Sequence, residues 1–171
     1  YEYTSKWNSI AIVSAGSRVL GLGNIGPEGA IPVMEGKAIL FKKFGNVDAI
    51  PICINAKDAA DIAHVVRAIA PSFGGINLED IDAPKCFEVE DMLSDLPIPV
   101  FHDDQHGTAV VVLAGLINSL KVVNKSIADV KITVLGAGAA GLGITRLLLS
   151  YGAKHIVVCD SSGTIYNGRK K

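Results

Sequence analysis

The sequence has few cysteines and almost no excess charge, and each shortage excludes a class of protein. Its three cysteines, Cys53, Cys86 and Cys159, are widely separated, so they form neither a disulfide framework nor a paired-cysteine metal site. An odd number of scattered thiols suits the reducing cytoplasm, where we expect this protein. The formal net charge is −1 and no long basic run is present, so we expect no nucleic-acid partner.

The sequence also lacks a long apolar run. Its most apolar stretch, residues 109–120, is too short to span a membrane and contains Asn118, so we expect no membrane association. The first residues include neither Met nor a basic cluster, and no secretory signal peptide is visible. The missing Met suggests that the chain was trimmed at its start.

Hydrophobic residues make up 49% of the chain but aromatic residues only 6%, so the core must be built from Ile, Val, Leu and Ala. Short apolar strands alternate with amphipathic helices, which predicts an α/β fold with parallel strands and right-handed crossovers. The predicted strands are residues 10–13, 19–22, 47–54, 75–78, 98–101, 131–135 and 155–159, and the predicted helices are residues 27–44, 58–69, 84–96, 108–123 and 138–151.

A glycine-rich loop follows the strand at residues 131–135 and opens the next helix. It consists of Gly136, Ala137, Gly138, Ala139, Ala140 and Gly141. In this spacing the first glycine makes the tight turn, the second admits a pyrophosphate, and the third lets helix and strand pack closely. The free N–H groups of the helix would bind the pyrophosphate. The alternative, a glycine-rich turn without a ligand, is disfavoured by the complete β–α–β context.

Asp160 ends the second strand of this unit, about 20 residues after the loop, where an acid binds the ribose hydroxyls of a dinucleotide. Because an acid repels a 2′-phosphate, the sequence favours NAD, with NADP possible. We therefore predict two domains. Residues 1–125 form a parallel-sheet domain that binds substrate, and residues 126–171 form the first part of a Rossmann NAD-binding domain.

Two predicted strands of the first domain end in pairs of acids, Glu79-Asp80 and Asp103-Asp104. The carboxyl ends of parallel strands meet at one edge of a sheet, where ligands bind. Carboxylates gathered there would repel one another without a cation, and oxygen ligands suit Mg²⁺ or Mn²⁺. For a single pair, acids that merely start the next helix would be the better explanation. Two pairs favour a metal site.

Lys37 lies inside a mostly apolar predicted helix. An apolar setting lowers the pKa of a lysine and can make it a base near neutral pH. The alternative is a lysine whose stem packs on apolar neighbours while its ammonium stays in water. The spacing of the residues alone does not separate the two.

Together these motifs resemble the malic enzymes, specifically the shorter bacterial and archaeal type. The resemblance covers essentially the whole chain, with its motifs in the order and spacing of that family. The matching stretches are residues 18–26 (RVLGLGNIG), 32–37 (PVMEGK), 73–80 (FGGINLED), 101–109 (FHDDQHGTA) and 136–141 (GAGAAG).

This resemblance implies oxidative decarboxylation of L-malate to pyruvate and CO₂, with a divalent metal and NAD(P). It implies that Lys37 is the catalytic lysine and Asp103 its acidic partner. It also implies that the protein forms a homodimer or a larger homo-oligomer. The remaining implied site residues are Glu79, Asp80 and Asp104 as metal ligands, Arg18 as a ligand of the substrate carboxylate, and Asp160 as the acid of the cofactor site.

The sequence departs from the family pattern at several points. The family's catalytic tyrosine lies in a motif upstream of residue 1, and neither Tyr1 nor Tyr3 matches that motif. Ala15 stands where the family usually has Asp, which removes a turn-forming side chain and is expected to loosen the loop before Arg18. A second hypothesis follows: a non-catalytic segment that binds metal or nucleotide, or serves as an assembly module.

Overall fold

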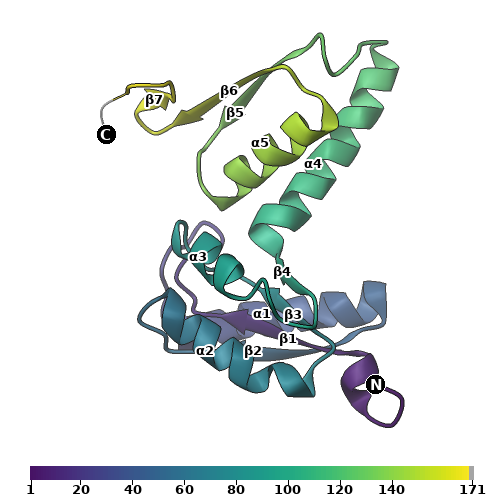
Figure 1. Cartoon of the computed structure of the whole chain (residues 1–171), viewed down its shortest axis with the longest axis vertical. Coiled ribbons are helices and arrows are strands. Elements are labelled where there is room, and N and C mark those ends of the chain that lie inside the picture. The colour runs from purple at the N-terminus through teal and green to yellow at the C-terminus, as the bar shows by residue number, and fades with distance from the viewer. Residues whose placement is uncertain (170–171) are drawn as a thin grey trace. The chain divides into compact units, whose positions relative to one another are not determined.

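The computed structural model describes residues 1–169. Lys170 and Lys171, which the sequence analysis assigns to the second domain, lie outside the described residues. The chain divides into two compact units, Tyr1–Asp103 and Asp104–Lys171, and Figure 1 shows the elements of each. Among the described residues, no helix is both long enough and apolar enough to cross a membrane.

The first unit is built on a four-stranded parallel sheet in the order β2-β1-β3-β4. The two central strands carry the core, because Ile12 and Val13 on β1 and Leu78 on β3 are fully buried. This sheet confirms the predicted α/β fold with parallel strands. The strands are β1 (Ser9–Ser14), β2 (Asp48–Cys53), β3 (Gly75–Leu78) and β4 (Val100–His102).

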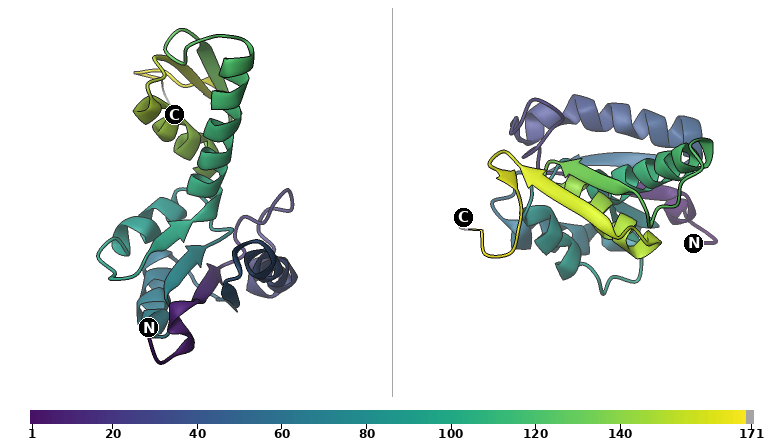
Figure 2. Two further views of the ribbon diagram at one scale, coloured as in Figure 1. Left: turned by 90° about the vertical axis from the view of Figure 1, so that its right-hand side faces the viewer. Right: turned by 90° about the horizontal axis from the view of Figure 1, so that it is seen from above.

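Helices cover both faces of this sheet. Figure 2 shows α1 (Gly26–Gly45) on one face, with α2 (Ala59–Ile69) and α3 (Lys85–Met92) on the other. Asp58 begins α2 as predicted, since its carboxylate accepts a hydrogen bond of 2.9 Å from the backbone N–H of Asp61. Short 3-10 turns, η1 (Ser5–Trp7) and η2 (Ala70–Ser72), precede β1 and follow α2.

The second unit pairs two helices with a small sheet. Its elements are α4 (Asp103–Val122), which begins at the last residue of the first unit, β5 (Lys131–Leu135), α5 (Ala139–Tyr151), β6 (His155–Asp160) and β7 (Gly163–Thr164). A Cβ atom on Gly143 of α5 would lie 2.7 Å from the carbonyl oxygen of Gln105 on α4. Only glycine therefore permits this close helix crossing.

Three details differ from the sequence-based expectations. Residues 19–22 form no strand; they make a tight turn closed by an isolated bridge between Val19 and Gly23. The strands are not all parallel, because β7 pairs antiparallel with β6 through a hairpin. Helix α4 begins at Asp103 rather than at residue 108, since acidic side chains are favourable in the first turn of a helix.

The compact units divide between Asp103 and Asp104, whereas the sequence pattern places the domain boundary after residue 125. The difference is the assignment of α4, which is grouped with β5 and α5 in the structure. A division by contacts does not identify functional domains, so the boundary at 125/126 stays a prediction.

Candidate functional site

Lys37 lies at the centre of a charged cluster in the first unit. Its ammonium is 2.6 Å from Oδ2 of Asp103 and 3.2 Å from each of the two carboxylate oxygens of Glu79. The lysine comes from α1, Glu79 follows the carboxyl end of β3, and Asp103 follows β4. The topology therefore brings together three residues that are 24 to 66 positions apart in sequence.

The pKa of Lys37 depends on both its burial and the acids that face it. Burial of the ammonium lowers the pKa, but the hydrogen bond and charge of Asp103 and the charge of Glu79 outweigh it, so the pKa of Lys37 is raised. The sequence left open whether the pKa of Lys37 is lowered or its ammonium stays in water. In the structure the ammonium is bound by two carboxylates, which the apolar spacing along α1 does not reveal.

Glu79 is the acid that the end of β3 contributes to this cluster, and its pKa is strongly raised. Burial raises its pKa to about 7, although Asn77 and Lys37 both favour the charged form. The amide of Asn77 donates a buried hydrogen bond of 2.8 Å to Oε2 of Glu79. Sequence reasoning overlooked Asn77, although its place two residues before Glu79 on β3 puts both side chains on one face of the sheet.

Three carboxylates gather beside this cluster. Oxygens of Glu79, Asp80 and Asp104 all lie within 4.8 Å of one another. Asp80 follows β3 closely and has a left-handed backbone conformation with a φ of 52°. Asp104 is the residue after Asp103 in the first turn of α4. An all-oxygen donor set with two buried members fits Mg²⁺ or Mn²⁺, so the residues present fit the metal that the sequence analysis predicts.

Arg18 lies in the loop between β1 and α1. Its backbone N–H donates a 3.2 Å hydrogen bond to the carbonyl oxygen of Asp80, which holds this loop beside the acidic cluster. The side chain at position 15 cannot form a turn hydrogen bond, but Ser14 Oγ accepts one from the N–H of Gly16 at 3.0 Å. Two hydrogen bonds, from the N–H groups of Gly16 and Arg18, therefore hold the loop. The effect of Ala15 on the mobility of the loop stays a prediction.

The glycine-rich loop of the second unit has the backbone geometry that its spacing requires. Gly136 has a φ of 115°, a conformation that favours glycine, and its N–H donates to the carbonyl of Cys159 on β6 at 2.8 Å. A Cβ on Gly141 would lie 1.8 Å from the carbonyl oxygen of Gly136. Gly138 faces open space in the described structure and precedes the first turn of α5, which contains Ala139 and Ala140. Ala137 completes the loop.

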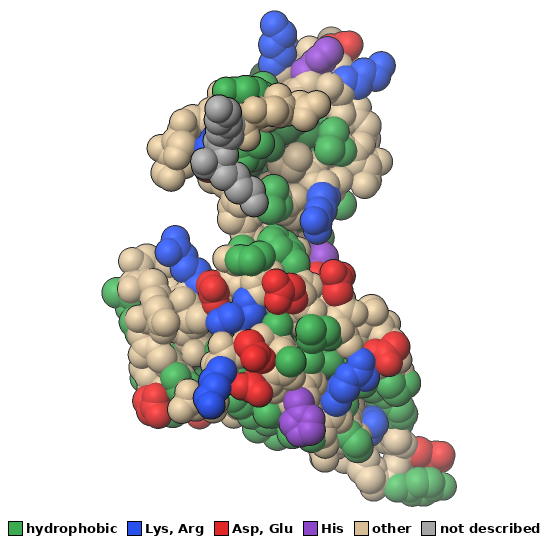
Figure 3. All heavy atoms as spheres, turned by 60° about the vertical axis from the view of Figure 1, so that its left-hand side comes forward, with side chains coloured by type: hydrophobic (Ala, Val, Ile, Leu, Met, Phe, Trp, Pro, Cys, Tyr) green, Lys and Arg blue, Asp and Glu red, His purple; other side chains and the backbone are tan. Residues whose placement is uncertain are grey.

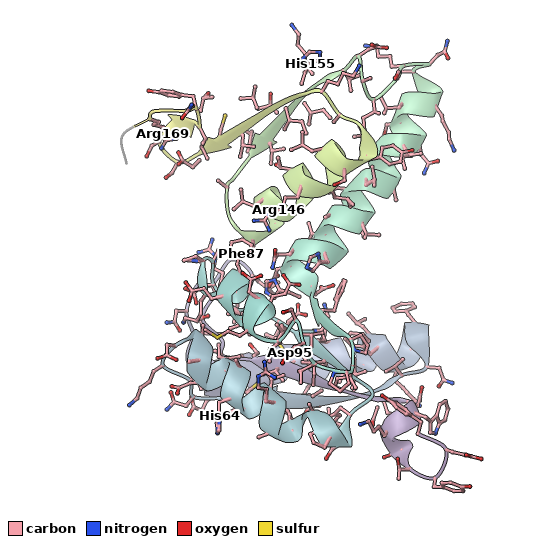
Figure 4. All side chains as sticks on the ribbon, in the orientation of Figure 1. His64, Phe87, Asp95, Arg146, His155 and Arg169 are labelled. Carbon is pink, nitrogen blue, oxygen red and sulfur yellow. The ribbon has the colours of Figure 1, made fainter. Side chains whose placement is uncertain are left out.

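Asp160 ends β6 as predicted, but it has a partner that the sequence analysis did not consider. Nη2 of Arg169 donates to both of its carboxylate oxygens, at 2.9 and 2.8 Å, and this pairing lowers the pKa of Asp160. Figure 4 shows Arg169 beside the β6–β7 hairpin. The charge of Asp160 is therefore offset, which weakens the argument that this acid excludes a 2′-phosphate.

Two family profiles match this chain in succession. Residues 1–63 match "Malic enzyme, N-terminal domain", and residues 105–170 match "Malic enzyme, NAD binding domain". The chain belongs to the malic enzyme family. Both the predicted family and the predicted order, an N-terminal malic enzyme domain before the start of an NAD-binding domain, are confirmed.

Individual malic enzymes support the same assignment. The chain is 58% identical over 167 residues to the NAD-dependent malic enzyme of Geobacillus stearothermophilus and 53% identical over 173 residues to the NADP-dependent malic enzyme of Salmonella typhimurium. The crystal structure of the NAD-dependent malic enzyme from Thermotoga maritima superposes with a TM-score of 0.95 at 55% identity.

These alignments cover 97%, 99% and 98% of this chain, in the same order. They cover 35%, 23% and 45% of the three malic enzymes. The chain therefore spans less than half the length of each of these relatives.

Proposed function

We propose that the polypeptide represented by this chain catalyses oxidative decarboxylation of L-malate to pyruvate and CO₂, with reduction of NAD(P) and a requirement for a divalent metal. One observation carries the proposal. The ion-paired Lys37 and Asp103 lie next to the oxygens of Glu79, Asp80 and Asp104, so a proton-transfer pair and a cation site share one end of the sheet.

In this proposal Glu79, Asp80 and Asp104 hold Mg²⁺ or Mn²⁺. When bound, the cation supplies positive charge that polarises the C2–O bond of malate. Arg18, whose backbone is tied to Asp80, holds a substrate carboxylate through its guanidinium. Its location on a loop beside the acids supports this role.

Lys37 and Asp103 are proposed to move the hydroxyl proton. As an ammonium, Lys37 must release a proton before it can accept one from the C2 hydroxyl of malate. Asp103, 2.6 Å away, is within direct reach of that proton. The pair can thus act as a short relay, with Lys37 at the substrate side, while hydride leaves C2 for the nicotinamide.

The cofactor is proposed to bind at the loop from Gly136 to Gly141, with its pyrophosphate on the N-terminus of α5. Asp160 binds the adenosine ribose, and we propose NAD as the cofactor, with NADP also accommodated. The further proposals are a cytoplasmic location, a homodimeric or larger assembly, and a functional boundary at residue 125/126. On the face shown in Figure 3, acidic and basic side chains are interspersed over the first unit, which gives no support to a nucleic-acid partner.

A second candidate is a non-catalytic segment that binds metal or nucleotide, or acts as an assembly module. It rests on the acidic cluster and the glycine-rich loop, each of which can bind a ligand without catalysing a reaction. Calorimetric titration with Mn²⁺ and with NAD, alongside an NADH assay with L-malate, separates the two. Turnover supports the enzyme; binding without turnover by both this chain and the longer polypeptide supports the module.

Asp104→Asn tests the metal site within the enzyme proposal. In the longer polypeptide it removes one carboxylate charge from the cation site, so metal-dependent malate oxidation should be abolished while NAD affinity stays nearly unchanged. Asp129→Asn, an exposed carboxylate on the loop before β5, is the matched control and should retain activity. An unchanged rate for Asp104→Asn would refute the assignment.

A further inference from the structure

We propose that Asn77 is a positioning residue that fixes the orientation of the Glu79 carboxylate for a divalent cation; this inference rests on the metal site of the proposed function. The two residues stand two positions apart at the end of β3, on the face of the sheet that α1 covers. Both are buried, with 3% and 8% of their surfaces exposed. The 2.8 Å bond from Nδ2 of Asn77 to Oε2 of Glu79 is itself buried.

The alternative support for Glu79 is less rigid. Lys37 reaches the same carboxylate with an ammonium 3.2 Å away, but it does so at the end of four rotatable bonds and also binds Asp103. Asn77 has only two side-chain torsions. Its strand is hydrogen-bonded on both sides, with Asn77 in register with Ile12 of β1 and Phe101 of β4. The amide is therefore the fixed contact that sets the plane of the carboxylate.

The fold gains little from an amide at this position. Among the described residues, Oδ1 of Asn77 is buried without a hydrogen-bond partner. A buried unpaired acceptor costs stability, and an apolar side chain of similar shape would avoid that cost. The orphaned acceptor indicates that the donor half of the amide is kept for what it does to Glu79, as orienting contacts to metal ligands do.

The surroundings of Asn77 allow a sharp test. An apolar pocket of about 260 Å³ is lined by Asn77, Phe41 and Phe101 among others. Asn77→Leu removes the donor and keeps the branched shape of the side chain, whereas Asn77→Gln keeps an amide on a longer stem. Ile76→Val is the control, because the neighbouring side chain on β3 points to the opposite face.

The experiment measures Mn²⁺ affinity of the full chain by electron paramagnetic resonance, and its Tm in EDTA. We expect Asn77→Leu to weaken Mn²⁺ binding by about tenfold or more while its Tm stays equal or rises. Asn77→Gln should recover much of the affinity. Ile76→Val should lower the Tm and leave Mn²⁺ binding unchanged.

Two kinds of result would overturn the inference. Unchanged Mn²⁺ affinity in Asn77→Leu, or a fall in Tm with no recovery by Asn77→Gln, would show that Asn77 is not a positioning residue, while the metal site itself would stand. If the unsubstituted chain binds no Mn²⁺, the metal site fails, and the role of Asn77 fails with it.

Discussion

The ammonium of Lys37 lies 2.6 Å from Oδ2 of Asp103, although α1 and β4 are far apart in sequence. This contact is shorter than the 3.2 Å that separates the same ammonium from Glu79. Lys37 is thus held mainly by the acid that the family resemblance assigns as its partner, and Glu79 keeps its buried bond from Asn77. In the proposed function, Lys37 and Asp103 form the proton-transfer pair, and Glu79 belongs to the cation site beside them.

Replacing Lys37 with methionine should stop proton transfer without emptying the metal site. Lys37→Met keeps the length of the side chain but removes the group that exchanges the hydroxyl proton, so kcat should fall about 100-fold or more. Mn²⁺ affinity should not weaken, because a competing positive charge is removed from Glu79. Steady-state kinetics with malate in the longer polypeptide and Mn²⁺ titration measure the two effects.

Lys42→Met is the control for that experiment. Lys42 lies further along α1 and pairs with Asp48 in an exposed contact, which contributes little stability. It should leave kcat unchanged. Retained turnover in Lys37→Met would remove the lysine from the proposed mechanism.

Glu79 should make the stability of the metal-free chain depend on pH. Because burial raises its pKa from 4.5 to about 7, the folded state holds a proton that the unfolded state has released. The stabilisation from this proton is complete below pH 4.5 and is lost as the pH rises through about 7. Urea unfolding in EDTA between pH 4.5 and 8 should show this decline. Glu79→Gln, which cannot ionise, should flatten it; parallel pH curves for the two proteins would contradict the prediction.

Arg169 should influence the choice between NAD and NADP. Its guanidinium offsets the charge of Asp160 and offers donors suited to a phosphate. Arg169→Gln should therefore weaken NADP binding by about tenfold or more while changing NAD binding less. Calorimetry with both nucleotides measures the ratio. Lys154→Gln removes one positive charge just before the other end of β6 and should leave the ratio of NAD to NADP affinity unchanged. An equal loss of affinity for both nucleotides in Arg169→Gln would show that Arg169 only stabilises the local structure.

Two glycines of the dinucleotide loop should respond differently to alanine. Gly141→Ala forces a methyl group against the carbonyl of Gly136, so it should destabilise the second unit by more than ~2 kcal/mol. Gly138→Ala meets no described atom within 4 Å and should leave the Tm nearly unchanged, yet its methyl group would obstruct the pyrophosphate. Calorimetric melting combined with NAD titration tests both; normal NAD affinity in Gly138→Ala would argue against the proposed cofactor position.

Local patterns were sufficient to predict most elements of the fold. The ranges of β3 and β5 coincide with those expected from the sequence, because short apolar runs bounded by turn residues are unambiguous there. The sequence predicted that α4 starts at residue 108, but the helix starts at Asp103. Asp103 and Asp104 follow a strand directly, so the sequence pattern does not show that they already form the first helical turn. The turn at residues 19–23 was mistaken for a strand because its apolar residues imitate one.

The residue types of the candidate site were also readable from the sequence, but their pairing was not. The convergence of acids could be predicted because parallel strands end at one edge. That Lys37 faces two of these acids depends on how α1 packs on the sheet, which no local spacing reveals. Arg169 was overlooked for a similar reason, because only the hairpin of the folded chain brings it to Asp160. Asn77 was overlooked although its spacing from Glu79 along a strand could have indicated the contact.

The close crossing of α4 and α5 restricts position 143 to glycine. A methyl group at position 143 would collide with the backbone of Gln105, the residue after Asp104. Any larger side chain would displace Asp104 relative to the helix that begins at the dinucleotide loop. A substitution at Gly143 would consequently resemble an active-site mutation in an activity screen, because it acts through the position of Asp104.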